Sequence, residues 1–510
     1  MEQKVASGSL QEKIQHFKAL DEKISHFSSI AGLTDWDQKV MAPKKGRARF
    51  AKAIGTLRTE AFKLSISEEM GRLLEALTNE KAQMVLDEVT TAQVRERNDF
   101  YQRSKAIPEE MFKEYSILTA EANDAWEFAR ENNDFAHFAP YLEQIVAFKR
   151  KFAEIYGYEK HPYDALLDEY EPGFTVEKLD SLFSALRQSS VELLNRIKES
   201  PNQTPAHIFD QRFDIEKQKE FNRYILPIIG YDLEAGRLDE TVHPFALAIN
   251  TGDVRITTRY LEDNVLSALF GTIHEAGHGK YEQNIDKKFE DTVLASGTSF
   301  GIHESQSRFL ENMVGRSREF WNYFYPRLVE MFPEQLGDVK EEDFYRAVNT
   351  VKPSLIRIEA DELTYNLHIM VRYEIEKALI GGELEVHYLP QVWNKKMEEY
   401  LGVVPESDSE GVLQDVHWSF GGFGYFPSYS LGNLYAAQIM KAIKKDVPDF
   451  EAAISKGDFT SVDAWLKEKI HQYGALFRPS ELIVRATGEE LNASYLTEYL
   501  EEKYTNVYKL

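Results

Sequence analysis

Cysteine is absent from all 510 residues of the sequence, and its absence excludes several kinds of chemistry. Without cysteine the protein has no disulfide, no thiol nucleophile and no thiolate ligand for a metal. A metal site in this chain must therefore be built from His, Asp or Glu side chains.

Long apolar runs and an excess of positive charge are also missing. No segment has the roughly 20 consecutive apolar residues that cross a bilayer, and the opening MEQKVASGSLQEKIQHF has charges where a secretion signal needs an apolar stretch. The 60 Lys and Arg residues are outnumbered by 84 Asp and Glu residues, which gives a formal net charge of -24. Nucleic acids and anionic membranes attract clustered positive charge, so we expect neither as a partner and expect a cytoplasmic location.

The residues that are present are typical of a folded, mainly α-helical protein. Apolar residues make up 43% and charged residues 28% of the chain, as in ordinary globular proteins. Helical periodicity rich in Glu, Lys, Leu and Ala runs through most of the sequence. In the opening segment the apolar positions follow steps of three and four: Leu10, Ile14, Phe17, Leu20, Ile24, Phe27 and Ile30.

The length of the chain allows either several domains or one large helical body. Clusters of Pro, Gly and Ser predict loops at residues 198–207, 403–412 and 421–433. We interpret residues 1–510 as a single domain with a candidate subdomain seam near 198–210. The segment DVRITTRY (253–260) is rich in β-branched residues and follows an Asn-Thr-Gly turn, so it predicts a short strand in a small sheet.

The segment GTIHEAGHGKYE, residues 271–282, contains two histidines four residues apart. At helical spacing His274 and His278 project from the same side, so both imidazoles reach one cation. Glu275 lies about 100° around the helix, beside that cation, where its carboxylate takes a proton from water. Chance produces this pattern in roughly a few per cent of such chains. The preceding NVLSALFGTI has helical apolar spacing and no proline, which favours a helix and a metal site.

A catalytic zinc ion usually has three protein ligands, so the histidine pair needs a third. The pattern with a further His six residues later is excluded, because Asn284 stands at that position. Glu282 lies too far along the helix axis to share the cation. The segment SFGIHESQSRFLENMVG (299–315) predicts a second helix with Glu304 near its start, and we expect Glu304 to be the third ligand. The alternative is an ordinary solvated helix glutamate.

Five motifs follow one another along the chain: DVRIT (253–257), HEAGH (274–278), HESQ (303–306), IRIEAD (356–361) and GVLQDVHW (411–418). In this order they resemble the M32 family of metallocarboxypeptidases, the thermostable bacterial and archaeal type related to the gluzincin peptidases. No position within the motifs departs from the family pattern. LTDWDQKVMAP (33–43) is also similar to the start of the family, so the resemblance covers about the whole chain.

The resemblance implies a nearly all-helical fold with a deep groove, a small β-sheet next to the active-site helix, and a homodimer. It implies removal of single residues from the free C-terminus of peptides, with broad side-chain tolerance. It also implies one Zn²⁺ per chain, which Co²⁺ replaces in some members.

An enzyme that acts at a peptide C-terminus must recognise a free carboxylate, and a fixed guanidinium suits this task. Within the family motifs, Arg357 and Arg255 are the candidates, and we expect Arg357 to make this contact. The alternative for each is an ion pair with a sequence neighbour, Asp361 for Arg357 and Asp253 for Arg255.

Four further residues have candidate roles. His417 and Tyr425 are expected to donate hydrogen bonds to the substrate or to the developing oxyanion. The alternatives are a core histidine beside Trp418 and an aromatic loop that covers helix ends. His303 and Asp361 are candidate partners for the outer nitrogens of the metal-binding imidazoles.

Together these residues and the family resemblance predict a zinc carboxypeptidase in which Glu275 acts as the general base. Two alternatives remain open. A gluzincin-type oligoendopeptidase shares the zinc motif but does not depend on a free C-terminus. A non-catalytic helical peptide-binding protein retains the histidines but has no need of Glu275.

Overall fold

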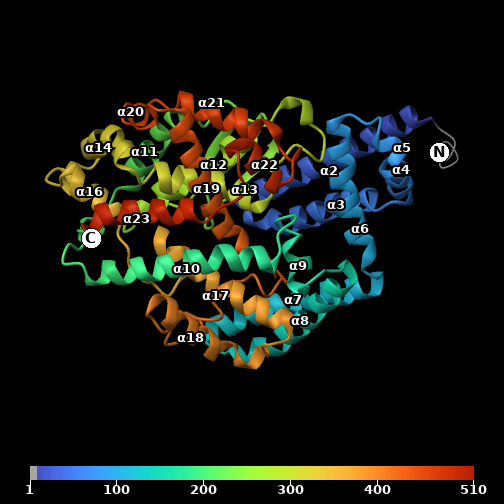
Figure 1. The fold of residues 1–510 in the computed structure, drawn as a ribbon, viewed down its shortest axis with the longest axis horizontal. Coiled ribbons are helices and arrows are strands. Elements are labelled where there is room, and N and C mark those ends of the chain that lie inside the picture. The colour runs from blue at the N-terminus through green and yellow to red at the C-terminus, as the bar shows by residue number, and fades with distance from the viewer. Residues whose placement is uncertain (1–8) are drawn as a thin grey trace.

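The computed structural model describes residues 9–510, which are mostly helical (Figure 1) and contain one small three-stranded sheet. The predicted opening helix is confirmed as α2 (Leu10–Val40), which buries Phe17, Leu20 and Ile24. Its start is a capping box in which the side chains of Ser9 and Glu12 each accept the other residue's backbone N–H. The expectation of a missing secretion signal rests in part on residues 1–8, outside the described residues.

The rest of the described chain is also mainly helical, in agreement with the predicted fold class. None of the helices within 9–510 combines the length and the apolar character that a membrane crossing requires. The α-helices that follow α2 in the first half of the chain are α3 (Arg47–Ser65), α4 (Glu68–Thr78), α5 (Glu80–Gln83), α6 (Glu88–Ala106), α7 (Glu109–Asn132), α8 (Phe135–Tyr156), α9 (Pro162–Leu167), α10 (Val176–Glu199) and α11 (Ile215–Ile228).

The second half of the chain is also mostly helical and includes one π-helical stretch, η4 (Phe309–Val314), directly after α13. Its α-helices are α12 (Val265–Gln283), α13 (Phe300–Arg308), α14 (Arg318–Met331), α15 (Pro333–Leu336), α16 (Glu341–Val348), α17 (Glu362–Gly381), α18 (Leu389–Leu401), α19 (Pro427–Asp446), α20 (Phe450–Ile454), α21 (Thr460–Lys469), α22 (Pro479–Thr487) and α23 (Ser494–Tyr508).

The predicted strand is confirmed as β3 (Asp253–Thr258), the middle strand of a sheet with β1 (Gly236–Glu240) and β2 (Ala246–Asn250). The β1 strand is parallel to β3 and β2 is antiparallel to it. The hydroxyl of Thr258 donates to the carbonyl of Ala268, 3.1 Å away, and so ties β3 to α12. The sheet therefore supports the helix that carries both motif histidines.

The loop prediction for 421–433 is wrong in its second half, because α19 begins at Pro427. Proline is tolerated in the first turn of a helix, where its missing N–H has no helical partner. The following residues are buried on nearly all sides, including Leu431 and Leu434. Burial of this stretch therefore outweighs its Gly and Ser content.

The core consists of one large cluster of buried side chains and one smaller cluster. The large cluster includes Ile197, Ile208 and Phe213, so it is continuous across the candidate seam near 198–210. The smaller cluster, which includes Phe17, Leu73 and Val94, lies among α2, α3, α4 and α6 at one end of the molecule (Figure 1). The division at 198–210 stays a prediction.

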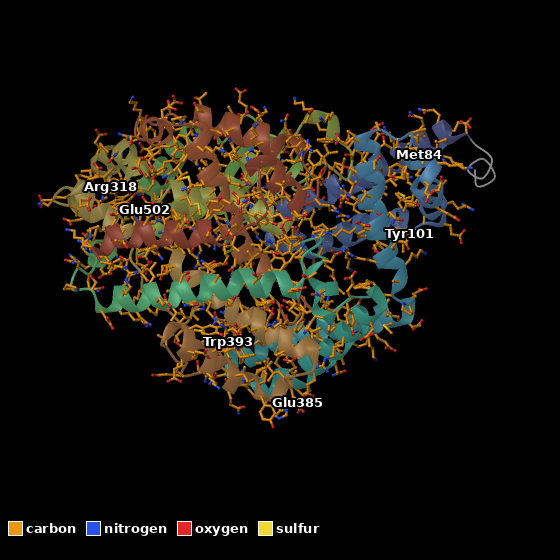
Figure 2. All side chains as sticks on the ribbon, viewed as in Figure 1. Met84, Tyr101, Arg318, Glu385, Trp393 and Glu502 are labelled. Carbon is orange, nitrogen blue, oxygen red and sulfur yellow. The ribbon has the colours of Figure 1, made fainter. Side chains whose placement is uncertain are left out.

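Most large apolar side chains lie inside the molecule, and charged side chains cover its surface (Figure 2). Trp393 is buried below α17, whereas Arg318, Glu385 and Glu502 project outward into solvent. Long α10 crosses the middle of the molecule between α23 and α17 (Figure 1). The helices α12, α13 and α19 pack together beside the sheet and carry the candidate site.

Candidate metal site and substrate cavity

Two glycines allow the helices of the site to approach one another closely. A Cβ on Gly277, between the two motif histidines in α12, would lie 2.5 Å from the carbonyl oxygen of Gln306 in α13. A Cβ on Gly432 in α19 would lie 2.5 Å from Cγ of Glu304. Larger side chains at these positions would push α13 away, so both glycines help to bring Glu304 to the histidines.

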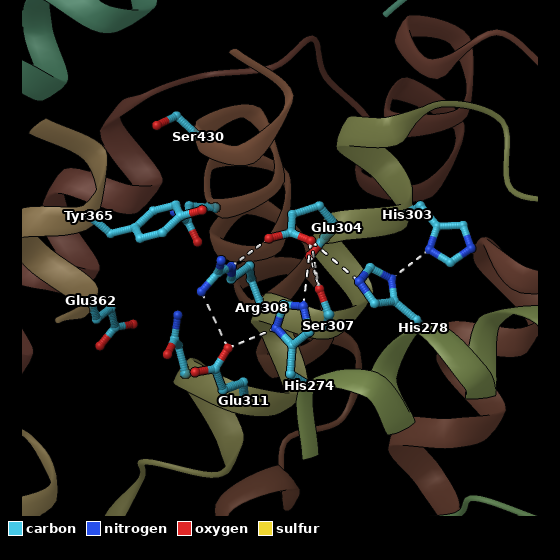
Figure 3. Close-up of polar contacts among 12 residues, drawn as sticks. His274, His278, His303, Glu304, Ser307, Arg308, Glu311, Glu362, Tyr365 and Ser430 are labelled. Carbon is cyan, nitrogen blue, oxygen red and sulfur yellow. Dashed lines mark hydrogen bonds and ion pairs between the residues drawn. The ribbon is translucent and has the colours of Figure 1, made fainter. Parts of the chain in front are cut away.

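The side chains of His274, His278 and Glu304 converge on one point (Figure 3). Oε2 of Glu304 lies 3.7 Å from Nε2 of His274 and 3.4 Å from Nε2 of His278. Ligands about 2.1 Å from a tetrahedral zinc ion would be about 3.4 Å apart, so this spacing fits a cation between them. Within residues 9–510, this is the group of His and acidic side chains whose geometry fits a metal ion.

The outer nitrogen of His274 is held by a carboxylate. Nδ1 of His274 lies 2.9 Å from Oε2 of Glu311, which the π-helical stretch after α13 carries. Arg308 connects the two carboxylates: its Nε donates to Oε1 of Glu304 at 2.7 Å and its Nη1 donates to Oε2 of Glu311 at 3.3 Å. A hydrogen bond to Nδ1 keeps that nitrogen protonated and directs the Nε2 lone pair to a cation.

The outer nitrogen of His278 is held by a second imidazole. Nδ1 of His278 lies 2.6 Å from Nδ1 of His303, and Nε2 of His303 lies 2.7 Å from Oε1 of Glu282. In this network the carboxylate accepts from His303, and His303 in turn accepts from His278. The structure therefore places His303 next to a candidate ligand and leaves Glu282 outside the converging group.

The charge states of His278 and Glu304 suit metal binding. Burial lowers the pKa of His278 to about 3 and keeps this imidazole neutral. Burial opposes ionisation of Glu304, but Arg308 and the two histidines outweigh it and lower the pKa of that carboxyl well below its usual range. For His274 burial is outweighed by Glu304 and Glu311, which raise its pKa, so a metal ion competes with a proton for this imidazole.

Glu275 faces the same cavity as the three converging side chains. Its carboxylate has no hydrogen-bond partner among the described residues, and burial raises its pKa to about 7. A carboxyl group with such a pKa exchanges a proton readily near neutral pH.

The cavity in front of these residues has a volume of about 1510 Å³. The converging group lies in its wall, and Tyr425, Ser428 and Tyr429 from the start of α19 and the preceding loop lie beside that group. Residues of α3, α6 and α7 line the same cavity. The helices α3 and α6 lie toward the end of the molecule that holds the N-terminus, away from α12 (Figure 1). The predicted deep groove is thus present, and it reaches the predicted histidines.

Arg357 is buried in an ion-pair network behind this wall. Its Nε and Nη2 donate to Oδ1 of Asp415 at 3.0 and 2.7 Å, and its Nη1 donates to Tyr365 at 2.9 Å. Oδ2 of Asp415 accepts from Nε of Arg372 at 2.6 Å. The ring of Tyr429 lies 5.0 Å from the Arg357 guanidinium and separates it from the cavity.

Two other predicted residues lie away from the cavity wall. Arg255 makes the ion pair with Asp253 that was the alternative to substrate binding. Its Nε and Nη2 each donate to Asp253 at 2.7 Å. Asp361 caps α17, where it accepts from the N–H groups of Leu363 and Thr364. The structure does not bring Asp361 to either motif histidine, because its carboxylate is used in starting the helix.

His417 is buried among aromatic rings beside Tyr425 and Tyr429. Its Nε2 lies 3.4 Å from the hydroxyl of Tyr429, and its Nδ1 has no partner among the described residues. Burial lowers the pKa of His417 to about 4. His417 is therefore one layer behind the cavity, whereas Tyr425 lines it.

Glu311 and Arg308 are site residues that motif reading overlooked. Glu311 is seven residues after Glu304, which is two helical turns along the same face. That spacing is a signal from which it could have been found. Arg308, four residues after Glu304, has the spacing of a helical ion pair.

Replacing Glu311 by Ala is expected to weaken metal binding by about 10- to 100-fold, because His274 loses the group that orients its ring. Competition with a chromogenic chelator measures this affinity directly. Glu334→Ala, at an exposed helix position, is the matched control. Unchanged affinity in Glu311→Ala would show that Glu311 does not orient the ligand.

Comparison with known proteins identifies the family. Residues 16–504 match the family described as carboxypeptidase Taq (M32) metallopeptidase. The chain is 47% identical to "Carboxypeptidase 1" of Bacillus subtilis (strain 168) over 97% of this chain and 99% of that protein. It is 43% identical to "Thermostable carboxypeptidase 1" of Thermus thermophilus over 97% of this chain and 98% of that protein.

A solved structure agrees with these sequence relationships. The M32 carboxypeptidase from Deinococcus radiodurans R1 superimposes with a TM-score of 0.94, at 36% identity, over 98% of this chain and all of that one. The chain belongs to the carboxypeptidase Taq (M32) metallopeptidase family. It is therefore a carboxypeptidase, a hydrolase that uses a divalent metal ion.

Proposed function

We propose that the protein is a zinc carboxypeptidase that removes single residues from the free C-terminus of peptides, with broad side-chain tolerance. His274, His278 and Glu304 hold the ion, and Glu275 is the general base. The observation that supports this most directly is the convergence of two Nε2 atoms and one carboxylate oxygen in a cavity wall that also contains Glu275, whose carboxylate has no partner within residues 9–510.

A bound zinc ion supplies Lewis-acid chemistry, since it lowers the pKa of water and polarises a carbonyl group. Glu275 accepts the proton of the attacking water and then delivers it to the leaving amine. The carboxylates Glu311 and Glu282, the latter through His303, hold the two imidazoles in the tautomer that presents Nε2. Tyr425, on the cavity wall, is the candidate donor to the developing oxyanion.

Recognition of the terminal carboxylate is assigned to the positive charge around Arg357. Two guanidinium groups, Arg357 and Arg372, share one carboxylate, Asp415, which leaves one net positive charge in a buried network. Tyr429 lies between this charge and the cavity. A carboxylate at this end of the cavity is attracted strongly, because few water molecules screen the charge.

The test compares free and C-terminally amidated peptides of the same sequence, with metal-depleted and zinc-restored protein. Free peptides should lose one residue at a time in mass spectra, and only after zinc is restored. Amides should be cleaved about 30-fold more slowly or worse, since losing one partner of a buried charge pair costs about 2–5 kcal/mol. Equal cleavage of both, or first products from mid-chain, would instead indicate an endopeptidase.

Arg357→Ala should reduce this acid-over-amide preference, because the remaining Arg372–Asp415 pair is neutral. Arg357→Lys keeps the positive charge, so this variant should retain more of the acid-over-amide preference than Arg357→Ala does. A purely structural ion pair would lower the cleavage of acid and amide equally. The implied homodimer, the replacement of zinc by cobalt and the cytoplasmic location stay predictions.

A further inference from the structure

Three phenylalanines meet at the end of the cavity formed by α3, α6 and α7. Phe62, Phe100 and Phe112 come from these three helices in turn, and all three line the cavity that contains His274 and His278. Their exposed fractions are 37%, 43% and 49%. Exposed aromatic side chains that gather at one place in a cavity mark a binding surface more often than isolated ones do.

The three rings form one contiguous surface. The rings of Phe62 and Phe112 are stacked, with centroids 6.3 Å apart and planes at 12°. The ring of Phe100 meets that of Phe62 edge to face, also at 6.3 Å. A further aromatic or aliphatic side chain placed on this surface would complete an aromatic cluster that is now open to solvent on one side.

The charged groups of the adjoining wall are mostly used by one another. Arg478 pairs with Glu96 at 3.3 Å and with Asp99. Arg103 pairs with Asp168. Glu169 of the same wall pairs with Lys149 at 3.4 Å, whereas Lys105 and Glu109 have no ion pair among residues 9–510. Most charges between the aromatic surface and the metal-site histidines are therefore already paired, and this wall suits a chain that contributes its own apolar side chains.

The position of the aromatic surface relative to the site indicates what occupies it. A carboxypeptidase cuts the last peptide bond, so every residue upstream of that bond must lead away from the metal ion. The positive charge of Arg357 lies behind Tyr429 on one side of the site, whereas the aromatic surface lies at the α3, α6 and α7 end. At about 1510 Å³ the cavity exceeds the roughly 300–1000 Å³ of a typical ligand pocket, so it has room for several residues.

We propose that Phe62, Phe100 and Phe112 form a subsite that binds an apolar or aromatic side chain of the peptide substrate upstream of the scissile bond. The inference rests on the proposed carboxypeptidase reaction at His274 and His278. It makes the enzyme tolerant at the last residue but selective for one residue farther from the C-terminus.

A set of peptides that share the same C-terminal dipeptide tests the subsite. The upstream residues are polar except for a single Phe, which is placed at a different upstream position in each peptide. For wild type, kcat/KM should rise about 10-fold when Phe occupies one particular position, relative to Ser there, which is the scale of a modest apolar contact. An N-acetylated dipeptide with a free C-terminus has no upstream position at which Phe can be placed, so it reports the reaction alone.

The triple variant Phe62→Ser, Phe100→Ser and Phe112→Ser should lose the position-specific gain and cleave the acetylated dipeptide at the wild-type rate. Because these rings are partly exposed, the variant is expected to fold. Phe112→Ser alone should lose part of the gain. The matched control is Phe128→Ser, since Phe128 is exposed on the same helix, α7, but does not line the cavity.

A flat profile across upstream positions in wild type, with the acetylated dipeptide still cleaved, would overturn the subsite and leave the proposed reaction intact. Failure of wild type to cleave the acetylated dipeptide would count against the reaction itself. A triple variant that keeps the preference for Phe would also overturn the subsite. So would a triple variant that differs from wild type only in its oligomer mass, because that result would show that the aromatic surface joins two copies of the chain.

Discussion

Glu275→Gln is expected to lower kcat by about 10²- to 10⁴-fold while zinc content and Tm stay at their wild-type values. The amide has nearly the same shape as the carboxylate but accepts no proton at neutral pH. The Glu275 carboxylate makes no protein hydrogen bond within the described residues, so the substitution breaks no structural contact. Steady-state kinetics, elemental analysis and thermal unfolding of the same preparation measure the three quantities.

The control for this prediction is Glu334→Gln, which changes an exposed glutamate of α15 to the same amide. Its kcat should equal that of wild type. Nearly normal turnover in Glu275→Gln with full zinc content would mean that another group takes the proton of the attacking water. The mechanism proposed for Glu275 would then be wrong.

Glu304→Ala is expected to weaken metal binding by more than the roughly 100-fold that outer hydrogen-bond partners contribute, and activity should fall with metal content. The substitution removes Oε2, which lies within 3.7 Å of both histidine Nε2 atoms. It also leaves buried Arg308 with Glu311 as its remaining carboxylate partner.

Two effects must therefore be separated in this variant. Glu304→Gln keeps a hydrogen-bond acceptor for Arg308 but replaces the anionic ligand with a neutral one, so it should retain more of the unfolding free energy and still bind metal weakly. Chelator competition and thermal unfolding of the metal-free proteins give the two readouts. Undiminished metal affinity in both variants would remove Glu304 from the site.

The candidate metal site could be predicted mainly because its parts are local. The i and i+4 spacing of His274 and His278 is a property of one helix, and α12 forms as its apolar periodicity indicates. Glu304 could be expected because the HESQ motif lies in a second periodic segment, which the structure confirms as α13.

The partner of Arg357 could not be predicted in the same way. The ion-pair alternative for this arginine was Asp361, four residues away, but Asp361 caps α17 and the guanidinium pairs with Asp415, 58 positions along the chain. Nothing in the local pattern distinguishes these carboxylates. Arg255, by contrast, pairs with its neighbour Asp253, because alternate positions on β3 share one side of the strand.

The sequence by itself therefore determined the mainly helical class, the short strand β3, the histidine pair and its adjacent glutamate, since each depends on residues within a few turns of one another. Tertiary structure decided what those residues contact. Gly277 and Gly432 allow three helices to lie close enough for Glu304 to meet the histidines, and packing of α3, α6 and α7 gathers one phenylalanine from each of these helices. Helical periodicity records which side of one element a residue is on, but only the packed chain determines which element lies opposite.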